Sequence, residues 1–131
     1  MKAIRKFEFI LPNEYIDKIL TGFSFSVSKD LHKLKINKSR LKELLSENHA
    51  EDNTHLIGDL LWGSKDVGIR KVRLKKGKGK GKREGYRLIA LVLNVKNKAF
   101  VLHIYDKKKK SKLTDSDEEN LKKILKNFRN K

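Results

Sequence analysis

The side chains with the clearest capacity for chemistry are cations concentrated between residues 70 and 87. This segment holds ten Lys or Arg residues against a single acid, Glu84. Lysine and arginine stabilise the negative charge that develops on a phosphate during phosphoryl transfer, so the segment predicts a site for a phosphate-rich ligand. The ten cations are Arg70, Lys71, Arg73, Lys75, Lys76, Lys78, Lys80, Lys82, Arg83 and Arg87.

Within this segment, residues 75–83 form a basic loop in which glycines alternate with lysines. Glycine lets backbone N–H groups approach phosphates closely. The loop lacks the Gly-Lys-Ser/Thr ending of nucleotide hydrolases, so we expect it to contact a nucleic-acid backbone; a solvated charged loop or a localisation signal is the alternative. The residues expected to contact nucleic acid, including two beyond the last predicted strand, are Arg70, Lys75, Lys76, Lys78, Lys80, Lys82, Arg83, Lys108 and Lys110.

The cations before the loop alternate with apolar residues, as residues on a strand do. Lys71 and Arg73 would share one face, while Val72 and Leu74 would share the other face with Arg70. A strand with one cationic face predicts a sheet whose open side meets an anion, or an ordinary exposed sheet face.

Arg87 opens an apolar stretch, where a guanidinium needs a partner. That partner could be a phosphate, or a structural one such as Glu84 or Asp106. Alternation groups Arg87 with Ile89 and Leu91, and the strand register decides whether their face is open or covered.

Two residues of the last apolar stretch could move a proton. His103 and Tyr105 would lie on the same strand face, where either could act as an acid or base or stack on a nucleobase; a structural role is the alternative for each. The other histidines are scattered, and the absence of cysteine excludes thiol catalysis and cysteine-ligated metals. No metal or other cofactor is therefore expected.

RNA permits one reaction without a metal, because it carries its own nucleophile, the 2′-OH. An enzyme has to align this hydroxyl with the phosphate, stabilise the developing charge, and manage two protons. A group of Lys, Arg and Tyr side chains on a sheet would be sufficient.

The elements that must position these residues can be predicted from periodicity. Apolar alternation or continuity predicts strands over residues 4–11, 69–74, 86–94 and 99–106, the last two forming a hairpin, and 86–94 a central strand covered on both faces. Short connections between strands favour an antiparallel sheet with helices on one side, an α+β fold. Residues 56–62 form a further apolar patch, and residues 23–27 a short strand or a linker.

Helices are predicted in the sequence both before and after the strands at 69–106. Apolar residues at helical spacing predict N-terminal helices over residues 15–20 and 29–48, packed on one side of the sheet, with Asn37 or Ser39 as a cap. The run from Ser116 to Glu119 is typical of a capping box and predicts a C-terminal helix.

The overall composition fits one domain spanning residues 1–131 with a polyanionic partner. The chain has 33 basic and 16 acidic residues, a net charge of +17, of which residues 66–131 carry +15. Such a surplus indicates nucleic acid, an acidic protein or an anionic membrane surface. No apolar run reaches the roughly 20 residues that cross a bilayer, and the first residues are too charged for a signal peptide, so a cytoplasmic protein is expected.

The ordered series of motifs in the C-terminal half resembles the RelE/HigB-like toxins of bacterial type II toxin–antitoxin systems. The matching pieces, which span about residues 56–128, are Gly-Ile-Arg-Lys-Val-Arg-Leu at 68–74, Gly-Tyr-Arg-Leu-Ile at 85–89, Phe-Val-Leu-His-Ile-Tyr-Asp-Lys at 100–107 and Lys-Leu-Thr at 112–114. Glu84 departs from the family pattern, which often has a second glycine there.

This resemblance implies a RelE-like α+β fold and ribosome-dependent, metal-independent cleavage of messenger RNA, which would inhibit translation. It also implies a cognate antitoxin that neutralises the toxin in a hetero-oligomer. It assigns Arg73 and Arg87 to the scissile phosphate, and Tyr105 or His103 to proton transfer. The residues it implies for catalysis are Lys71, Arg73, Arg87, His103, Tyr105 and Lys107, with Lys108 as a further charge.

Two other functions are consistent with the same residues. A non-catalytic RNA- or ribosome-binding protein would use the basic face for binding alone, and its affinity would fall in graded steps as lysines are removed. An interaction protein would use this face to bind one acidic partner and would bind RNA weakly.

Overall fold

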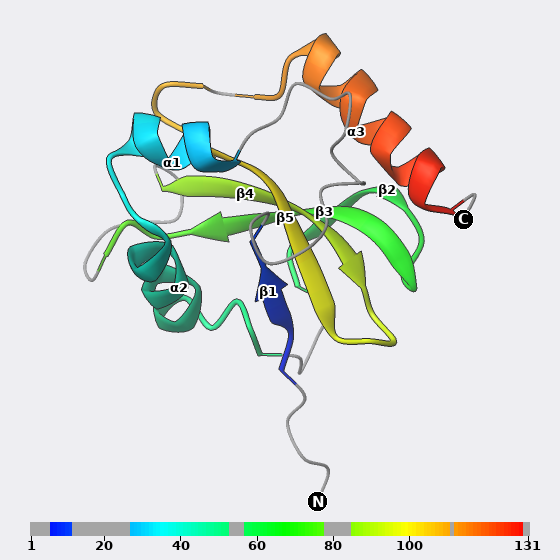
Figure 1. Cartoon of the computed structure of the whole chain (residues 1–131), viewed down its shortest axis with the longest axis horizontal. Coiled ribbons are helices and arrows are strands. Elements are labelled where there is room, and N and C mark those ends of the chain that lie inside the picture. The colour runs from blue at the N-terminus through cyan, green and yellow to red at the C-terminus, as the bar shows by residue number, and fades with distance from the viewer. Residues whose placement is uncertain (1–5, 12–26, 53–56, 78–84, 111, 130–131) are drawn as a thin grey trace, which may run out of the picture.

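The computed structural model describes residues 6–11, 27–52, 57–77, 85–110 and 112–129. These residues form a mixed five-stranded sheet and three helices, an α+β arrangement (Figure 1). The strands lie in the order β1-β5-β4-β3-β2. Their bounds are β1 Glu8–Ile10, β2 Asp59–Gly63, β3 Val67–Leu74, β4 Tyr86–Leu93 and β5 Lys98–Asp106. The helices are α1 Val27–Leu34, α2 Lys38–Glu47 and α3 Asp115–Arg129.

The central strand of the sheet is β4, as its composition predicts. All eight of its residues are buried, and six of them alternate between two apolar clusters on opposite faces of the sheet. Leu88 and Ala90 belong to one cluster, while Ile89 and Leu91 belong to the other. The strands predicted over 69–74, 86–94 and 99–106 are confirmed as β3, β4 and β5, and the expected hairpin joins the last two.

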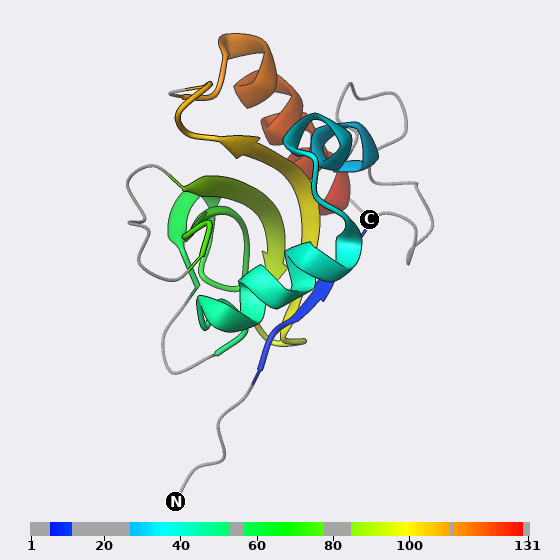
Figure 2. The same cartoon turned by 90° about the vertical axis from the view of Figure 1, so that its left-hand side faces the viewer.

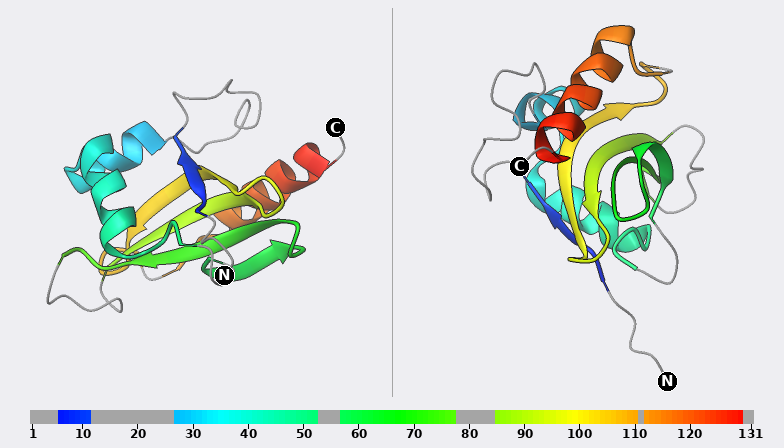
Figure 3. Two further views of the ribbon diagram at one scale, coloured as in Figure 1. Left: turned by 90° about the horizontal axis from the view of Figure 1, so that it is seen from below. Right: turned by 90° about the vertical axis from the view of Figure 1, so that its right-hand side faces the viewer.

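The helices contribute to different clusters. Leu31 of α1 and Leu44 of α2 join the cluster that contains Leu88, whereas Ile124 of α3 joins the cluster that contains Ile89. The prediction that all helices share one side of the sheet is therefore wrong, because short turns order the strands but do not decide which face a later helix covers. Figure 3 shows α1 and α2 towards one end of the sheet and α3 towards the other.

The sheet is mixed, not purely antiparallel as predicted. β1 pairs in parallel with the start of β5, through Glu8 opposite Lys98. A short turn forces an antiparallel pair only on the strands it connects. β1 is separated from β5 by most of the chain, so its direction is not constrained in this way.

Two further elements differ from the sequence predictions. The apolar patch at 56–62 contains an edge strand, β2, which pairs with β3. The box at the start of α3 is formed by Thr114 and Asp117, two residues earlier than predicted: the Thr114 hydroxyl accepts a hydrogen bond from Asp117 N (3.0 Å), and the Asp117 carboxylate accepts one from Thr114 N (3.1 Å). Asn37 caps α2 as expected, accepting a hydrogen bond from Arg40 N (2.8 Å).

The sheet is strongly curled (Figure 2). Two irregularities accompany this curvature, one between β2 and β3 and one between β4 and β5.

The predicted helix at 15–20 and the stretch 23–26 lie outside the described residues, whereas Val27 begins α1. None of the described helices combines the length and the apolar composition needed to cross a membrane.

Candidate active site

The sequence-predicted cations meet at the end of the sheet where β4 begins. In the antiparallel register, Arg87 of β4 lies directly opposite Arg73 of β3 on one side and Tyr105 of β5 on the other. Lys71 is the next residue of β3 on the same face as Arg73, and it lies opposite Ile89. All of these residues share the face of the sheet that α3 covers further along, so this end of the α3 face carries a row of polar side chains.

A pocket of about 200 Å³ lies at this row. We call it the cationic pocket; it is lined by Leu61, Trp62, Lys71, Arg87, Tyr105, Lys107, Lys112, Leu113 and Glu118. Four of the predicted catalytic residues therefore meet around one cavity, although they come from three strands and the turn after β5. The strand register places Arg87 on the same face as Ile89 and Leu91, which α3 covers. Arg87 lies at the end of that face, where the pocket opens.

Arg87 is the best-fixed cation of the pocket. Its side chain is only 5% exposed, and its Nη1 donates a hydrogen bond to the backbone carbonyl of Tyr86 (3.2 Å). Burial lowers the pKa of the Arg87 guanidinium, the neighbouring charge of Arg73 lowers it further, and Tyr105 opposes the shift. Like charges placed directly opposite each other destabilise a sheet, so a bound anion would stabilise this arrangement.

Glu84 and Asp106 are the two structural partners that the sequence predicts for Arg87. Asp106 binds Lys76 instead, with 2.7 Å between its Oδ2 and the lysine Nζ. Glu84 lies outside the described residues. Arg73 lies 3.4 Å from Asp59, but both side chains are more than half exposed, so this ion pair contributes little stability and leaves Arg73 accessible to a ligand.

Tyr105 is held as a neutral phenol. It is 7% exposed, and burial raises its pKa; the charge of Arg87 opposes the shift and that of Asp117 adds to it. Its hydroxyl therefore keeps its proton at neutral pH and can donate it. This distinguishes Tyr105 as a candidate proton donor, which the sequence alone left open between Tyr105 and His103.

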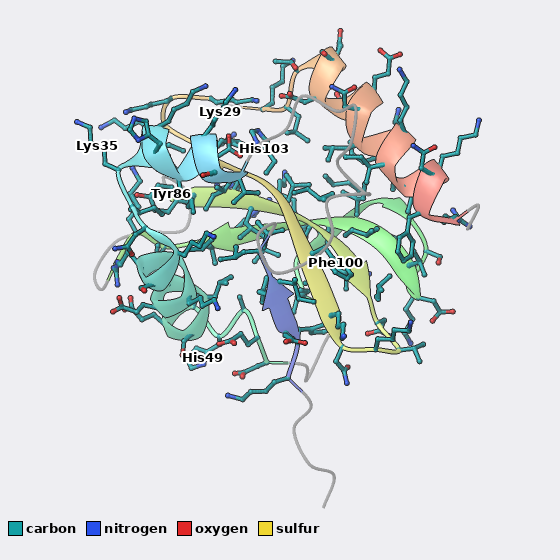
Figure 4. All side chains as sticks on the ribbon, in the orientation of Figure 1. Lys29, Lys35, His49, Tyr86, Phe100 and His103 are labelled. Atoms are coloured by element: carbon teal, nitrogen blue, oxygen red, sulfur yellow. The ribbon has the colours of Figure 1, made fainter. Side chains whose placement is uncertain are left out.

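His103 lies beside the cationic pocket but does not line it. Figure 4 shows His103 on β5 next to α1. Its Nδ1 is 2.8 Å from the Asp30 carboxylate on α1, and its Nε2 is 3.3 Å from Lys110 Nζ. A protonated lysine only donates hydrogen bonds, so Nε2 accepts from Lys110 and Nδ1 is the ring nitrogen that donates to Asp30. Both ring nitrogens are thus occupied by neighbouring side chains.

His103 and Tyr105 share a strand face, because they pair in regular register with Ile89 and Arg87 of β4. β5 pairs through His103 opposite Ile89 and Val101 opposite Ala90, which leaves one extra residue between them. This bulge lies before His103, so the alternation between His103 and Tyr105 is uninterrupted and their predicted shared face is confirmed. His103 lines a second cavity of about 440 Å³ beside α1, and Tyr105 lies between the two cavities, 5.4 Å from His103 between ring centroids. We call this second space the His103 cavity.

The backbone around the cationic pocket requires a glycine. A Cβ at Gly85 would come within 1.9 Å of the Leu74 carbonyl oxygen, because β3 and β4 converge there. The Gly85 carbonyl also accepts a hydrogen bond from Lys107 N (3.1 Å). Gly85 therefore fixes the start of the strand that carries Arg87 and the turn that carries Lys107.

The residues predicted to contact nucleic acid are dispersed. Arg70 is 5% exposed on the other face of β3, and its Nη1 donates to the carbonyl of Gly58 (3.1 Å), so it is separated from the pocket and holds the chain before β2. The start of the basic loop is tied to α2, because Asn48 accepts a hydrogen bond from Lys75 N (2.8 Å). Lys108 is exposed in the turn after β5. Four further residues lie outside the described part of the chain: Lys78, Lys80, Lys82 and Arg83.

Sequence reasoning missed three polar or aromatic residues of the pocket. Trp62 was noticed only as part of an apolar patch, and it reaches the site because β2 pairs with β3. Lys112 lies just before α3, and Glu118 lies in its first turn. The capping motif could have signalled that this end of α3 is near the last strand, but no local pattern indicates which sheet face it covers.

Within the described residues, no group of three or more His, Asp or Glu side chains is arranged to hold a metal ion. No known protein-family model matches the sequence.

Proposed function

We propose that the protein is a metal-independent RNA endonuclease that uses the 2′-OH of its substrate as the nucleophile. The observation that carries the proposal is the row formed in register by Arg73, Arg87 and Tyr105, bordered by the cationic pocket. Two adjacent guanidinium groups offer charge-assisted hydrogen bonds to one phosphate. A neutral phenol next to them can protonate the departing oxygen.

In this mechanism Arg87 and Arg73 bind the scissile phosphate and stabilise the extra negative charge of the transition state. Lys71 and Lys107 surround the same position and add positive charge. Tyr105 donates its proton to the 5′-oxygen as the bond from phosphorus to that oxygen breaks. His103 acts as a positioning residue for Tyr105 instead of touching the substrate.

The biological role we propose follows from the resemblance of the motifs to RelE/HigB-like toxins. We propose messenger RNA on the ribosome as the substrate, inhibition of translation as the result, and a cognate antitoxin as the partner that neutralises it in a hetero-oligomer. A RelE-like packing of the N-terminal helices and a cytoplasmic location belong to the same proposal. The motifs at 68–74, 85–89 and 100–107 support it.

Induced expression in a bacterial host tests this proposal. The wild-type chain is compared with Arg87→Ala and with Lys96→Ala. The second variant is the control, because it also deletes a positive charge but in the turn at the opposite end of β4. We expect growth arrest and discrete cuts in an abundant transcript for the wild type and Lys96→Ala, and neither for Arg87→Ala at equal levels of folded protein. The proposal would be overturned if transcripts stay intact in all three strains and also on ribosomes that carry an mRNA and are incubated with purified wild-type protein.

A non-catalytic RNA-binding protein would give a different pattern. Binding would persist without cuts, and each cation removed would lower the slope of log affinity against log salt by a similar step, about 0.7 for one contact to a single-stranded phosphate. The endonuclease instead requires that Arg87→Ala abolish cleavage while most of the salt-dependent binding remains.

A further inference from the structure

Glu118 is the one carboxylate among the residues that line the cationic pocket. It lies in the first turn of α3, where its backbone N–H donates to the carbonyl of Thr114 (3.0 Å), and its side chain is half-buried. It shares the pocket with Arg87, Tyr105 and Lys107. An acid in a site built to bind phosphate weakens binding by repulsion, so its presence there calls for a chemical reason.

The other acids near Tyr105 are already engaged by the fold. Asp30 binds His103 and the backbone N–H of Ile104, and Asp106 binds Lys76. Asp117 binds Lys110 and caps α3. In contrast, among the described residues no hydrogen bond or ion pair engages the Glu118 carboxylate.

Cleavage by the 2′-OH needs a proton acceptor as well as a donor. Burial keeps Tyr105 protonated, so it can donate but not accept. Lysine and arginine side chains ordinarily carry their protons at neutral pH, whereas a carboxylate ordinarily does not. Of the groups that line the pocket, a glutamate is the one whose ordinary state is that of a proton acceptor.

We propose that Glu118 is the general base of the reaction, an assignment that rests on the proposed endonuclease function. Its carboxylate takes the proton of the 2′-OH, and the 2′-oxygen forms a bond to phosphorus. The bond between phosphorus and the 5′-oxygen breaks, and this oxygen takes the proton of Tyr105. The products are a 2′,3′-cyclic phosphate and a 5′-hydroxyl; water then returns a proton to Tyr105 and removes one from Glu118.

Single-turnover cleavage by Glu118→Gln tests this role, with Glu119→Gln as the matched control. Glu119 is the neighbouring acid on the same turn, but it is exposed and lies 3.6 Å from Lys123, outside the pocket lining. The substrate is a transcript that the wild type cuts, free or on programmed ribosomes. Binding is measured with the same RNA carrying one 2′-deoxy nucleotide at the cut, which removes the nucleophile.

We expect Glu118→Gln to cleave about 100-fold or more slowly, the lower range for loss of a general base, while its affinity for the 2′-deoxy RNA is unchanged or higher. The rise of the wild-type rate from acidic to neutral pH should disappear in Glu118→Gln. Glu118→Asp should recover part of the rate, and Glu119→Gln should stay within about twofold of the wild type.

Cleavage by folded Glu118→Gln at the wild-type rate or faster would overturn this role, because it would show that the carboxylate only repels the substrate. The same holds if Glu118→Asp and Glu118→Gln are equally slow and bind the 2′-deoxy RNA equally poorly, since that pattern indicates a damaged pocket. Failure of the proposed function is distinguishable, because the wild type itself would then leave every transcript intact.

Discussion

The two cavities on either side of Tyr105 contain similar kinds of residue but arrange their charges differently. In the His103 cavity each acid faces a donor: Asp30 is 2.8 Å from the ring of His103, and Asp106 is 2.7 Å from Lys76. At the cationic pocket like charges lie side by side, because Arg87, which lines it, is directly opposite Arg73, whose ion pair with Asp59 is exposed. Pairs of opposite charge hold elements of the fold together, whereas adjacent like charges are stabilised by an anion from outside. This difference supports the choice of the cationic pocket, and not the His103 cavity, as the candidate site.

The two arrangements can be made alike by one substitution. Arg73→Glu gives Arg87 an opposite charge across the strand and removes one phosphate ligand. Cross-strand pairs and exposed ion pairs are each worth about 1 kcal/mol or less, so the free energy of unfolding should change by no more than about 1 kcal/mol. Cleavage should fall by about 1000-fold, as it does when an enzyme loses a donor that stabilises its transition state.

Urea unfolding and single-turnover cleavage of one transcript measure these two effects. Lys96→Glu provides the matched control, because it makes the same charge change in the turn far from the pocket. Equal loss of cleavage in Arg73→Glu and Lys96→Glu would mean that net charge, and not the row on the sheet, determines activity.

Tyr105 is the residue shared by the two cavities, and Tyr105→Phe removes only its hydroxyl. We expect cleavage to fall by about 100-fold, as is common when a general acid is lost, with little change in RNA affinity. Because burial raises the pKa of Tyr105, its proton should be lost only above the ordinary tyrosine value of about 10. The pH–rate profile of the wild type should therefore decline only above that pH, and Tyr105→Phe should lack the decline. An alkaline decline that persists in Tyr105→Phe would assign the proton donor elsewhere.

His103→Gln changes the His103 cavity instead. It removes the hydrogen bond between the ring and Asp30, which keeps its bond from Ile104 N, and a hydrogen bond to a charged group contributes about 1.5–3 kcal/mol. We expect the free energy of unfolding to fall within that range, while cleavage by the folded protein changes by only a few-fold. The opposite result, unchanged stability with a 100-fold slower reaction, would show that His103 itself transfers a proton.

The smallest expected effect concerns stability in acid. Burial alone would raise the pKa of Asp117, but hydrogen bonds from Lys110 and Thr114 lower it overall. A pKa lower in the folded than in the unfolded chain stabilises the fold above the unfolded value of about 3.9, and this contribution is lost as the pH falls through the folded value. Asp117→Asn should cost about 1–2 kcal/mol at neutral pH, in the range of a lost helix cap, and less at pH 2. An equal cost at both pH values would mean that the charge of Asp117 is unimportant.

Much of the sheet could be predicted because its signals are local. The continuous apolar run of β4 predicts a strand buried on both faces, and alternation places Lys71 and Arg73 on one face of β3. The parallel pairing of β1 and the face covered by α3 depend on contacts between distant segments, which no local period encodes. The early start of α3 was missed because Thr114 and Asp117 form as good a capping pair as Ser116 and Glu119.

The candidate site was predictable by residue type, and its grouping was predictable only for residues on the same strand. Arg87 could be singled out because a guanidinium at the edge of an apolar strand needs a partner. Alternation correctly grouped His103 with Tyr105, but it could not show that Asp30 of α1 engages the His103 ring. Trp62 and Glu118 come from elements whose positions depend on the tertiary fold, so nothing in their local sequence marks them as parts of a pocket.

The chemistry of the cut ends gives the sharpest measurement. Purified wild-type protein is incubated with a transcript, free or on ribosomes washed and assayed under conditions that keep them intact, and the ends produced at each new cut are identified by mass spectrometry. Attack by the 2′-OH predicts a 2′,3′-cyclic phosphate or 3′-phosphate next to a 5′-hydroxyl, and no cut where the nucleotide is 2′-deoxy. A 3′-hydroxyl next to a 5′-phosphate, or cutting of the 2′-deoxy RNA at the same position, would contradict the role assigned to the row of Arg73, Arg87 and Tyr105.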